Sequence, residues 1–452
     1  MGECLSLESY GYRGELVALL KKANVSVYDR IEVKTSDGFV FQGILMPKPE
    51  LSAPYIIVLK LDNGYNIGVA IDSSTEIHLI EKGKLSQPTP PKASLKIRED
   101  LPIVSILGTG GTIASRVDYK TGAVYPAFTV EDLYSLVPEL SEISRLRMEL
   151  LFNIFSEDMT PAYWKVIAEK VAKHIEEGVD GVVIAHGTDT MGYTAAALSF
   201  ALRNLPVPVV LVGAQRSSDR PSSDAALNLI GAVSVAAKAP FAEVVVVMHG
   251  ETSDSFCLAH RGTKVRKCHT SRRDAFRSIN AKPLAKIIGD TIKMLTNDYL
   301  PRDKKRELKV MSDFDEKVAL VKTFPGMTPD LIDTLIDKGY HGIVIEGTGL
   351  GHAPRSILSS IKRAIDEGIA VVMTSQCIWG RINMNVYRRG VELLKMGVIP
   401  GEDMLPETAL VKLMWVLAQT RDLKEVRRLM LTNIAGELNP RTIHSHYPPV
   451  EV

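Results

Sequence analysis

Two short loops rich in threonine and glycine carry residue types that could perform acyl-transfer chemistry. The first loop, 108–115, reads Gly-Thr-Gly-Gly-Thr-Ile-Ala-Ser and follows the apolar run 103–107. The second, 186–190, reads His-Gly-Thr-Asp-Thr and follows the apolar run 181–185. Threonine hydroxyls are potential nucleophiles, and glycines let backbone N–H groups approach a developing oxyanion. Because loops at the carboxyl ends of parallel strands meet in one crevice, the two loops indicate one active site.

Each loop also has a simpler interpretation. The first could be a phosphate-binding turn or a tight strand-to-helix connection. However, Ile113 stands where a dinucleotide fingerprint needs its third glycine, and no Gly-Lys-Ser/Thr follows to complete a P-loop. In the second loop, Thr188 and Thr190 could cap a helix whose positive N-terminal end favours Asp189. Capping is compatible with catalysis, so it does not exclude chemistry.

Composition limits the classes of function. The chain has 452 residues, 45% of them apolar, and this length favours two or three domains. A formal net charge of +1 gives no strong long-range field toward nucleic acid or a membrane. No apolar run is long enough to span a bilayer, and the first four residues begin no signal peptide, so we expect a cytoplasmic protein.

The cysteines are scattered, as is typical of a reducing compartment, at positions Cys4, Cys257, Cys268 and Cys377. Cys257 and Cys268, together with His260 and His269, could in principle supply four zinc ligands. Adjacent Cys268 and His269 would point in opposite directions in an extended backbone, and the segment around them is rich in cations. We therefore predict no metal site and no cofactor in this chain.

The first 85 residues are typical of a small all-β, barrel-like domain. Period-two alternation of polar and apolar residues indicates short strands, at 29–35, 39–45 and 55–60. Asp37-Gly38 and Asn63-Gly64 stand where hairpins would turn, because both dipeptides tolerate the positive φ angles of type I′ turns. The segment 86–100 contains the proline-rich run 87–92 and is predicted to be a linker.

From residue 101 onward, buried strands alternate with amphipathic helices, which indicates α/β domains with mostly parallel sheets. Strands are predicted at 103–107, 179–185, 208–212, 243–248, 318–322, 342–345 and 369–374, and helices at 163–177 and 224–237. We predict an α/β domain over 101–300 with the catalytic threonines, a charged linker over 301–315, and a second α/β domain over 316–452. The tail from residue 439 is expected to lie extended over the surface or a partner.

In their amino-acid sequences and in their order along the chain, the two loops resemble those of the bacterial-type L-asparaginase family. The resemblance runs from residue 101 to the last helices and implies a two-domain asparaginase-like core that hydrolyses a side-chain amide through an acyl-enzyme. It implies that Thr112 attacks the amide carbon and that Gly111 helps to bind the substrate. It also implies that Thr188 and Asp189 work with a later lysine, which the family's lysine-x-x-threonine spacing matches to Lys267.

A threonine hydroxyl is a poor nucleophile until a neighbour accepts its proton, and a lysine can accept it only if burial or nearby cations lower its pKa. Five cations stand near Lys267 in the sequence and could have this effect: Arg261, Lys264, Arg266, Arg272 and Arg273. From the pattern alone Lys267 would be one solvated cation in a basic stretch, and the family resemblance favours the catalytic role. Lys264 is the next candidate.

The resemblance also implies how the substrate is held. Ser156 matches the serine that holds the α-carboxylate, and Glu157 matches the residue that helps to hold the α-amino group. Many free asparaginases have glutamine at the second position, so Glu157 departs from their pattern. Asp189 would supply a counter-charge to the α-ammonium. Tyr125 matches a tyrosine of the mobile loop after the first motif better than Tyr119 does.

The family usually completes its site from a neighbouring protomer. The segment 376–383 of this chain stands where that contribution would arise, but it matches the simple enzymes too weakly to name a residue.

The remainder of the chain resembles one branch of the family. The segments 41–47, 60–68 and 113–119 resemble the asparaginase-like subunits of archaeal glutamyl-tRNA(Gln) amidotransferases. That resemblance implies a glutaminase that releases ammonia from glutamine, or asparagine, for the conversion of Glu-tRNA(Gln) to Gln-tRNA(Gln). It implies a kinase/amidase partner, the E subunit of the amidotransferase, that binds ATP and Mg and makes most of the tRNA contacts. A homodimer within a heterotetramer is also implied.

Two alternatives remain open. One is a free-standing L-asparaginase with an accessory domain, and the other is a catalytically idle binding scaffold. The scaffold would be favoured if Thr112, Thr188, Asp189 or Lys267 were missing, and all four are present.

Overall fold

The computed structural model describes residues 7–48, 53–61, 66–83, 98–110, 115–117, 124–126, 130, 133–134, 137–216 and 223–447. The chain divides into two compact units. The first comprises 1–95 with 112–138 and 214–226, and the second comprises 96–111 with 139–213 and 227–452. Among the helices described, none is long and apolar enough to cross a membrane.

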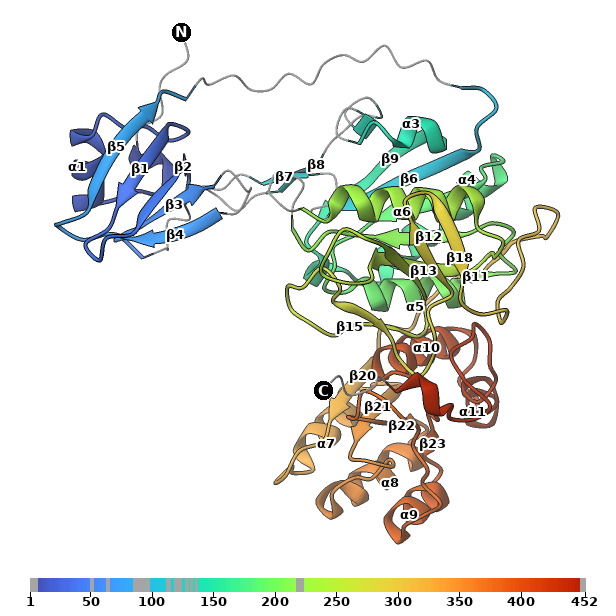
Figure 1. The fold of residues 1–452 in the computed structure, drawn as a ribbon. Coiled ribbons are helices and arrows are strands. Elements are labelled where there is room, and N and C mark those ends of the chain that lie inside the picture. The colour runs from blue at the N-terminus through green and yellow to red at the C-terminus, as the bar shows by residue number, and fades with distance from the viewer. Residues whose placement is uncertain are drawn as a thin grey trace. The chain divides into compact units, whose positions relative to one another are not determined.

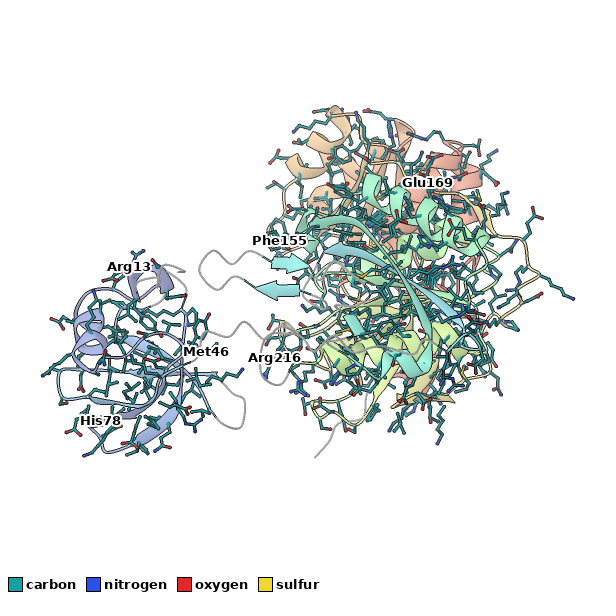
Figure 2. All side chains as sticks on the ribbon, turned by 90° about the horizontal axis from the view of Figure 1, so that it is seen from above. Arg13, Met46, His78, Phe155, Glu169 and Arg216 are labelled. Atoms are coloured by element: carbon teal, nitrogen blue, oxygen red, sulfur yellow. The ribbon has the colours of Figure 1, made fainter. Side chains whose placement is uncertain are left out.

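The N-terminal part of the first unit is a five-stranded antiparallel sheet with the strand order β4-β3-β2-β1-β5 (Figure 1). Its strands are β1 (Arg30–Lys34), β2 (Val40–Met46), β3 (Ile56–Lys60), β4 (Asn66–Ala70) and β5 (Glu76–Glu81). Side chains alternate between the core and solvent, so that Ile77 of β5 is buried whereas His78 is exposed (Figure 2). The predicted β-domain is confirmed, and in the described residues its ladder is open between β4 and β5.

A short helix, α1 (Glu15–Lys22), belongs to this domain although the sequence predicted only strands. Leu16, Val17 and Leu20 of α1 are buried in the same core as the alternate strand residues, such as Ile31. A helix of eight residues is marginal by itself and depends on burying its apolar face. The short span of α1 explains why strand periodicity dominated the sequence pattern.

The predicted turn at Asp37-Gly38 joins β1 to β2, but its type differs from the prediction. The Thr35 N–H donates to the Phe39 carbonyl at 2.9 Å, and the Gly38 N–H donates to the Thr35 carbonyl at 3.0 Å. In this loop Gly38 alone has a positive φ, +87°, whereas a type I′ turn requires two such residues. The turn is therefore a longer loop that ends in a left-handed glycine. Asn63-Gly64 lies outside the described residues.

The second unit contains an eight-stranded sheet with the order β18-β17-β14-β13-β12-β10-β6-β9 (Figure 1). The parallel strands are β6 (Ile103–Gly110), β9 (Arg145–Ile154), β10 (Gly181–Ala185), β12 (Val209–Val212) and β13 (Val244–His249). The antiparallel strands are β14 (Cys257–Arg261), β17 (Ala285–Ile288) and β18 (Thr291–Met294). The mostly parallel sheet is confirmed. The two predicted helices are α4 (Pro161–Glu176) and α6 (Ala225–Lys238).

Helix α5 (Met191–Ala201) lies between the two α/β halves of this unit, and most of its residues are buried, including the polar Thr194 and Ser199. Ala195 and Leu198 pack into the core of the eight-stranded sheet, whereas Ala196 and Phe200 pack into the core of the second α/β domain. Burial on both sides accounts for the absence of an exposed polar face. Because α5 begins directly after Thr190, the loop 186–190 lies at the positive end of the helix.

The second α/β domain has a four-stranded parallel sheet in the order β20-β21-β22-β23. Its elements are β20 (Val318–Lys322), α7 (Asp330–Asp337), β21 (Gly342–Gly347), α8 (Leu358–Asp366), β22 (Ala370–Ser375), α9 (Arg388–Met396), β23 (Ile399–Pro400), α10 (Pro406–Gln419) and α11 (Leu423–Met430). Figure 1 shows α7, α8 and α9 on one side of the sheet and α10 on the other. Neighbouring residues of β21 divide accordingly, since Ile343 packs with the α8 side and Val344 with the α10 side. This domain confirms the predicted strands.

Smaller elements complete the described fold. They are η1 (Leu7–Tyr10), β7 (Ser115–Val117), β8 (Val124–Pro126), α3 (Leu140–Ile143), η2 (Ser156–Asp158), β11 (Leu202–Arg203), β15 (Val265–Lys267), β16 (Phe276–Ser278), β19 (Lys309–Val310), η3 (Arg355–Ile357) and η4 (His444–His446). The charged stretch 301–309 is anchored rather than simply solvated, because Arg302 donates to the Ala237 carbonyl at 2.9 Å. The C-terminal tail is fastened by Asn439 and His446, both bonded to the Asn280 carbonyl.

Candidate active site

The two threonine loops start from neighbouring strands. β6 and β10 pair in parallel, so their carboxyl ends lie side by side, and the Thr109 hydroxyl donates to the Ala185 carbonyl at 2.9 Å. Gly110 has φ +110°, and a Cβ there would lie 2.2 Å from the Ile154 carbonyl oxygen. Only glycine fits this approach of two backbones. Gly111 and Thr112, which follow, lie outside the described residues.

Three of the predicted catalytic residues lie together. The Lys267 ammonium, at the end of β15, donates to Thr188 Oγ1 at 2.9 Å and to Asp189 Oδ1 at 2.8 Å. The Lys267 side chain is 14% exposed, whereas that of Asp189 is 67% exposed. The distance from Nζ to Oγ1 suits proton exchange between the amine and the hydroxyl. The Thr188 hydroxyl, the Lys267 amine and the Asp189 carboxylate thus form an arrangement that can relay a proton to and from a nucleophile.

The five cations near Lys267 in the sequence each have a carboxylate partner. The pairs are Arg261 with Glu243, Lys264 with Asp403, Arg266 with Glu407, Arg272 with Asp274 and Arg273 with Asp254. Their charges are compensated locally, so they do not form an uncompensated cationic cluster beside Lys267. Lys264 is held by its ion pair to Asp403 at 2.8 Å, whereas the hydroxyl of Thr188 is bonded to Lys267.

Ser156 and Glu157 lie on the short helix η2, beside the second threonine loop. The Ser156 hydroxyl lies 3.4 Å from Asp189 Oδ2, and the Thr190 hydroxyl donates to the Ser156 carbonyl at 2.7 Å. Ser156 is buried, whereas Glu157 is exposed. Thr190 occupies the N-cap position of α5 without a side-chain capping bond, so helix capping does not account for this loop.

Tyr125 lies on β8, where it pairs with Arg116 of β7. Its side chain is outside the described residues, as are Thr112 and Gly111, so the structure does not place these three side chains relative to Lys267.

A buried hydrogen-bond chain behind Thr188 was not anticipated from the sequence. His186 Nδ1 lies 2.6 Å from the Gly187 carbonyl, and its Nε2 lies 2.9 Å from the Thr194 hydroxyl. Because a carbonyl only accepts, Nδ1 carries the proton and Nε2 accepts from Thr194, which in turn accepts from Trp164 Nε1 at 3.1 Å. Burial lowers the pKa of His186 to about 4 and keeps the ring neutral. The chain fixes the peptide that precedes Thr188, and its only sequence signal was the histidine within the loop.

Gly187 gives a direct test of how tightly this loop packs. A Cβ at Gly187 would lie 2.6 Å from the Ser156 Cβ, a distance that real contacts do not reach. Gly187→Ala is therefore expected to push Thr188 or Ser156 from its position and to lower kcat/KM for amide hydrolysis about tenfold or more. Steady-state kinetics would measure the loss.

Gly289→Ala is the matched control, because Gly289 lies in the turn between β17 and β18 and a Cβ there meets no atom within 4 Å. Its φ of +59° strains an alanine but leaves the site untouched. Equal losses of activity in the two variants would contradict the packing explanation.

The candidate zinc ligands are used differently. The Cys257 thiol lies 3.6 Å from Asn228 Oδ1, and His260 Nδ1 lies 2.8 Å from the Ser278 hydroxyl. Within the part of the chain that the structure describes, no group of three or more His, Cys, Asp or Glu side chains could hold a metal ion.

Comparison with known families divides the chain into three matched parts. Residues 103–299 match the family model described as "Asparaginase, N-terminal", and residues 317–430 match "Glutaminase/Asparaginase C-terminal domain". Residues 25–80 match "GatD N-terminal domain".

Curated relatives extend over nearly the whole chain. The D subunit of the glutamyl-tRNA(Gln) amidotransferase from Pyrococcus furiosus is 62% identical over 427 residues, which cover 94% of this chain and 97% of the relative. The protein of the same description from Thermofilum pendens is 51% identical, with 97% and 99% covered. Among solved structures, the L-asparaginase from Thermococcus kodakarensis is 34% identical with a TM-score of 0.67, and the match covers 75% of this chain and all of that one.

Proposed function

This chain belongs to the family of glutamyl-tRNA(Gln) amidotransferase D subunits, and we propose on that premise that it is the ammonia-releasing glutaminase of such an amidotransferase. The observation that carries the proposal is the contact of Lys267 with Thr188 and Asp189 in a chain that also has the added N-terminal domain. The catalytic contact supports amide hydrolysis. The added domain and the nearly full-length relatives support the amidotransferase over a free-standing enzyme.

In the proposed reaction, Thr112 Oγ attacks the side-chain amide carbon of glutamine, and the hydroxyl proton passes through Thr188 to Lys267 Nζ. The tetrahedral intermediate then expels ammonia, whose nitrogen receives a proton, and a glutamyl ester remains on Thr112. Water attacks this ester in the second half, releasing glutamate and restoring the threonine hydroxyl. Thr188 and Lys267 relay protons in both halves, and the 2.9 Å distance between Nζ and Oγ1 supports that role.

The substrate is proposed to lie beside Asp189 and Ser156. The largely exposed Asp189 carboxylate can pair with the α-ammonium, and the Ser156 hydroxyl can donate to the α-carboxylate. Glu157, exposed on the same short helix, adds a second negative charge for the α-ammonium where many free asparaginases have a neutral glutamine. Tyr125 and Gly111 are proposed to complete substrate binding. Asparagine is accepted as an alternative substrate.

The relatives are subunits by name, so the chain is a component of a multi-subunit amidotransferase. We propose that its partner is the E subunit of that amidotransferase, a kinase/amidase that binds ATP and Mg and makes most of the contacts with Glu-tRNA(Gln). The ammonia then converts Glu-tRNA(Gln) to Gln-tRNA(Gln) on that partner. We further propose a homodimer within a heterotetramer, a cytoplasmic location and no cofactor in this chain.

A free-standing L-asparaginase is the second candidate, because the similar solved structures are asparaginases that cover about three quarters of this chain. Those structures match 75% of this chain, whereas the curated D subunits match 94–97% of the chain. The amidotransferase is therefore favoured.

Trapping the acyl-enzyme tests the proposed chemistry. A diazo-ketone analogue of glutamine should alkylate one threonine of the intact protein, and mass spectrometry of peptides should place the adduct on Thr112. Thr112→Ala should take up no label, because no other hydroxyl replaces the nucleophile. A label on Thr188 would overturn the choice of Thr112, and no label on either threonine would overturn the covalent mechanism.

A further inference from the structure

The strand that carries Lys267 has two functional faces. Alternation along β15 places Val265 and Lys267 on one face and Arg266 on the other, together with Lys264 just before the strand. Val265 is buried in the core of the eight-stranded sheet, and Lys267 reaches Thr188. Lys264 and Arg266 instead reach the second α/β domain, and this second face has no role in the proposed chemistry.

Lys264 makes a fully buried ion pair across the two domains. Its ammonium lies 2.8 Å from Asp403 Oδ2, with side-chain exposures of 1% and 5%. Burial lowers the pKa of Lys264, and the Asp403 carboxylate opposes that shift. Asp403 also accepts from the Asn439 backbone N–H at 3.0 Å and from the Asn439 side chain at 2.6 Å. Asp403 therefore links the start of the β15 hairpin to the second domain and to the C-terminal segment at Asn439.

Further contacts fasten the same face of the strand to the start of α10. Arg266 Nη2 lies 3.3 Å from Glu407 Oε1. The Thr408 hydroxyl donates to the Thr263 carbonyl at 2.9 Å. The segment 403–408 thus contacts three of the four residues from Thr263 to Arg266.

The partner strand of the hairpin is held in the same way. β16 pairs with β15, and just beyond its end the Asn280 side chain receives the Gly380 N–H at 2.8 Å and donates to the Gly380 carbonyl at 2.9 Å. Lys264, just before β15, and Asn280, just after β16, are therefore both bonded to the second domain. The hairpin that carries Lys267 has little freedom to move unless the second domain moves with it.

We infer that Lys264 and Asp403, assisted by Arg266 and Glu407, are positioning residues that hold Lys267 at Thr188. This inference rests on the proposed function of Lys267 as the proton relay. We call the two ion pairs, Lys264 with Asp403 and Arg266 with Glu407, the clamp. Because Lys264 directly precedes β15 and Lys267 is the last residue of this three-residue strand, a displacement of about 1 Å at the clamp would be carried to Lys267 Nζ with little attenuation. Such a displacement is enough to weaken catalysis strongly. Lys267 contacts the relay residue Thr188 and also Asp189, one of the groups proposed to hold the substrate, so we expect the clamp to lower kcat more than it raises KM.

Asp403→Asn in the full-length chain tests the inference, since it removes the charge and keeps the shape. Glutamine and asparagine hydrolysis should both show kcat lowered about tenfold or more, with KM within about twofold of wild type. The rate of labelling by the diazo-ketone analogue should fall in parallel. Arg266→Met, at a less buried pair, should lower kcat in the same direction and serves if Asp403→Asn folds poorly.

Glu437→Gln is the matched control. Glu437 forms an equally buried ion pair with Lys412 in the second domain and accepts from the backbone N–H groups of Ile434 and Ala435, and it acts on Lys264 through its charge and not through an ion pair. It should lower the melting temperature while leaving kcat near wild type. Wild-type kcat in both Asp403→Asn and Arg266→Met, or an equal loss of kcat in Glu437→Gln, would overturn the clamp.

The proposed function is judged separately in the same assays. All variants are compared with the wild type on whichever amide the wild type hydrolyses. If the wild type hydrolyses asparagine but not glutamine, the glutaminase proposal is refuted, and the clamp can still be tested on asparagine. Wild-type turnover by Lys267→Ala would refute the relay, and the clamp with it.

Discussion

Lys267→Ala is expected to abolish amide hydrolysis, lowering kcat about 10²–10⁴-fold, because it removes the group that exchanges a proton with Thr188. Thr188→Ala should have an effect of similar size, since it removes the other end of the same 2.9 Å contact. The two losses should not add in the double variant, because each single change already breaks the relay. Initial rates of ammonia release from glutamine would measure all three.

The control for this prediction is Lys264→Met, which changes the neighbouring lysine without removing the relay. It should retain more activity than Lys267→Ala, because Lys264 acts on Lys267 through the strand. Circular dichroism should show that Lys267→Ala is folded, since the two side-chain hydrogen bonds that Lys267 makes among the described residues go to groups that are exposed or partly buried. Near-normal turnover in Lys267→Ala would contradict its role, and lower turnover in Lys264→Met than in Lys267→Ala would reverse the assignment of the two lysines.

The sequence predicted the parts of the fold that leave a local pattern. Buried strands such as β10 and β21 are continuous apolar runs, and helix α4 has an amphipathic period, so each was found to within a few residues. Helix α1 was missed because eight residues give too short a period and because its stability comes from tertiary burial. The turn at Gly38 was assigned the wrong type because a dipeptide indicates where a hairpin turns better than how many residues the loop contains.

For the active site too, the sequence predicted the residues that belong to a local motif and not those that come together only in the fold. Thr188, Asp189 and Lys267 were found because family motifs mark them, and the structure brings them together. The contact of Lys264 with Asp403 joins residues 139 positions apart, and no spacing rule predicts such a pair. Thr194 and Trp164, which support His186, likewise come from different helices. The residues that hold a catalytic group in place come from distant parts of the chain. The sequence pattern around that group therefore does not reveal them.

A second large change in the rate of glutamine hydrolysis is expected when the kinase/amidase partner binds. Ammonia released before the acceptor is activated is lost to solvent, so a glutaminase subunit gains from hydrolysing glutamine only when the amidation site is occupied. Coupling free energies between sites are commonly about 1–3 kcal/mol, which corresponds to a several-fold to hundred-fold change. We therefore expect the isolated chain to be a weak glutaminase that is stimulated several-fold to hundred-fold when the kinase/amidase partner holds glutamyl-tRNA(Gln).

Thr188→Ala is the control for this stimulation, because any glutamine hydrolysis that survives in it comes from a contaminant or from the partner. Stimulation by uncharged tRNA alone, to the same extent as by glutamyl-tRNA(Gln), would show that assembly and not occupancy of the amidation site produces the effect.

The glutaminase assignment is tested by measuring glutamine and asparagine hydrolysis by the purified full-length chain. The chain is assayed alone, with the kinase/amidase partner, and with that partner plus ATP, Mg and glutamyl-tRNA(Gln). The glutaminase assignment predicts slow glutamine hydrolysis by the chain alone and a marked rise in the complete mixture, accompanied by formation of Gln-tRNA(Gln). Rapid asparagine hydrolysis by the chain alone, unchanged by the partner and the charged tRNA, would contradict that assignment and identify a free-standing asparaginase.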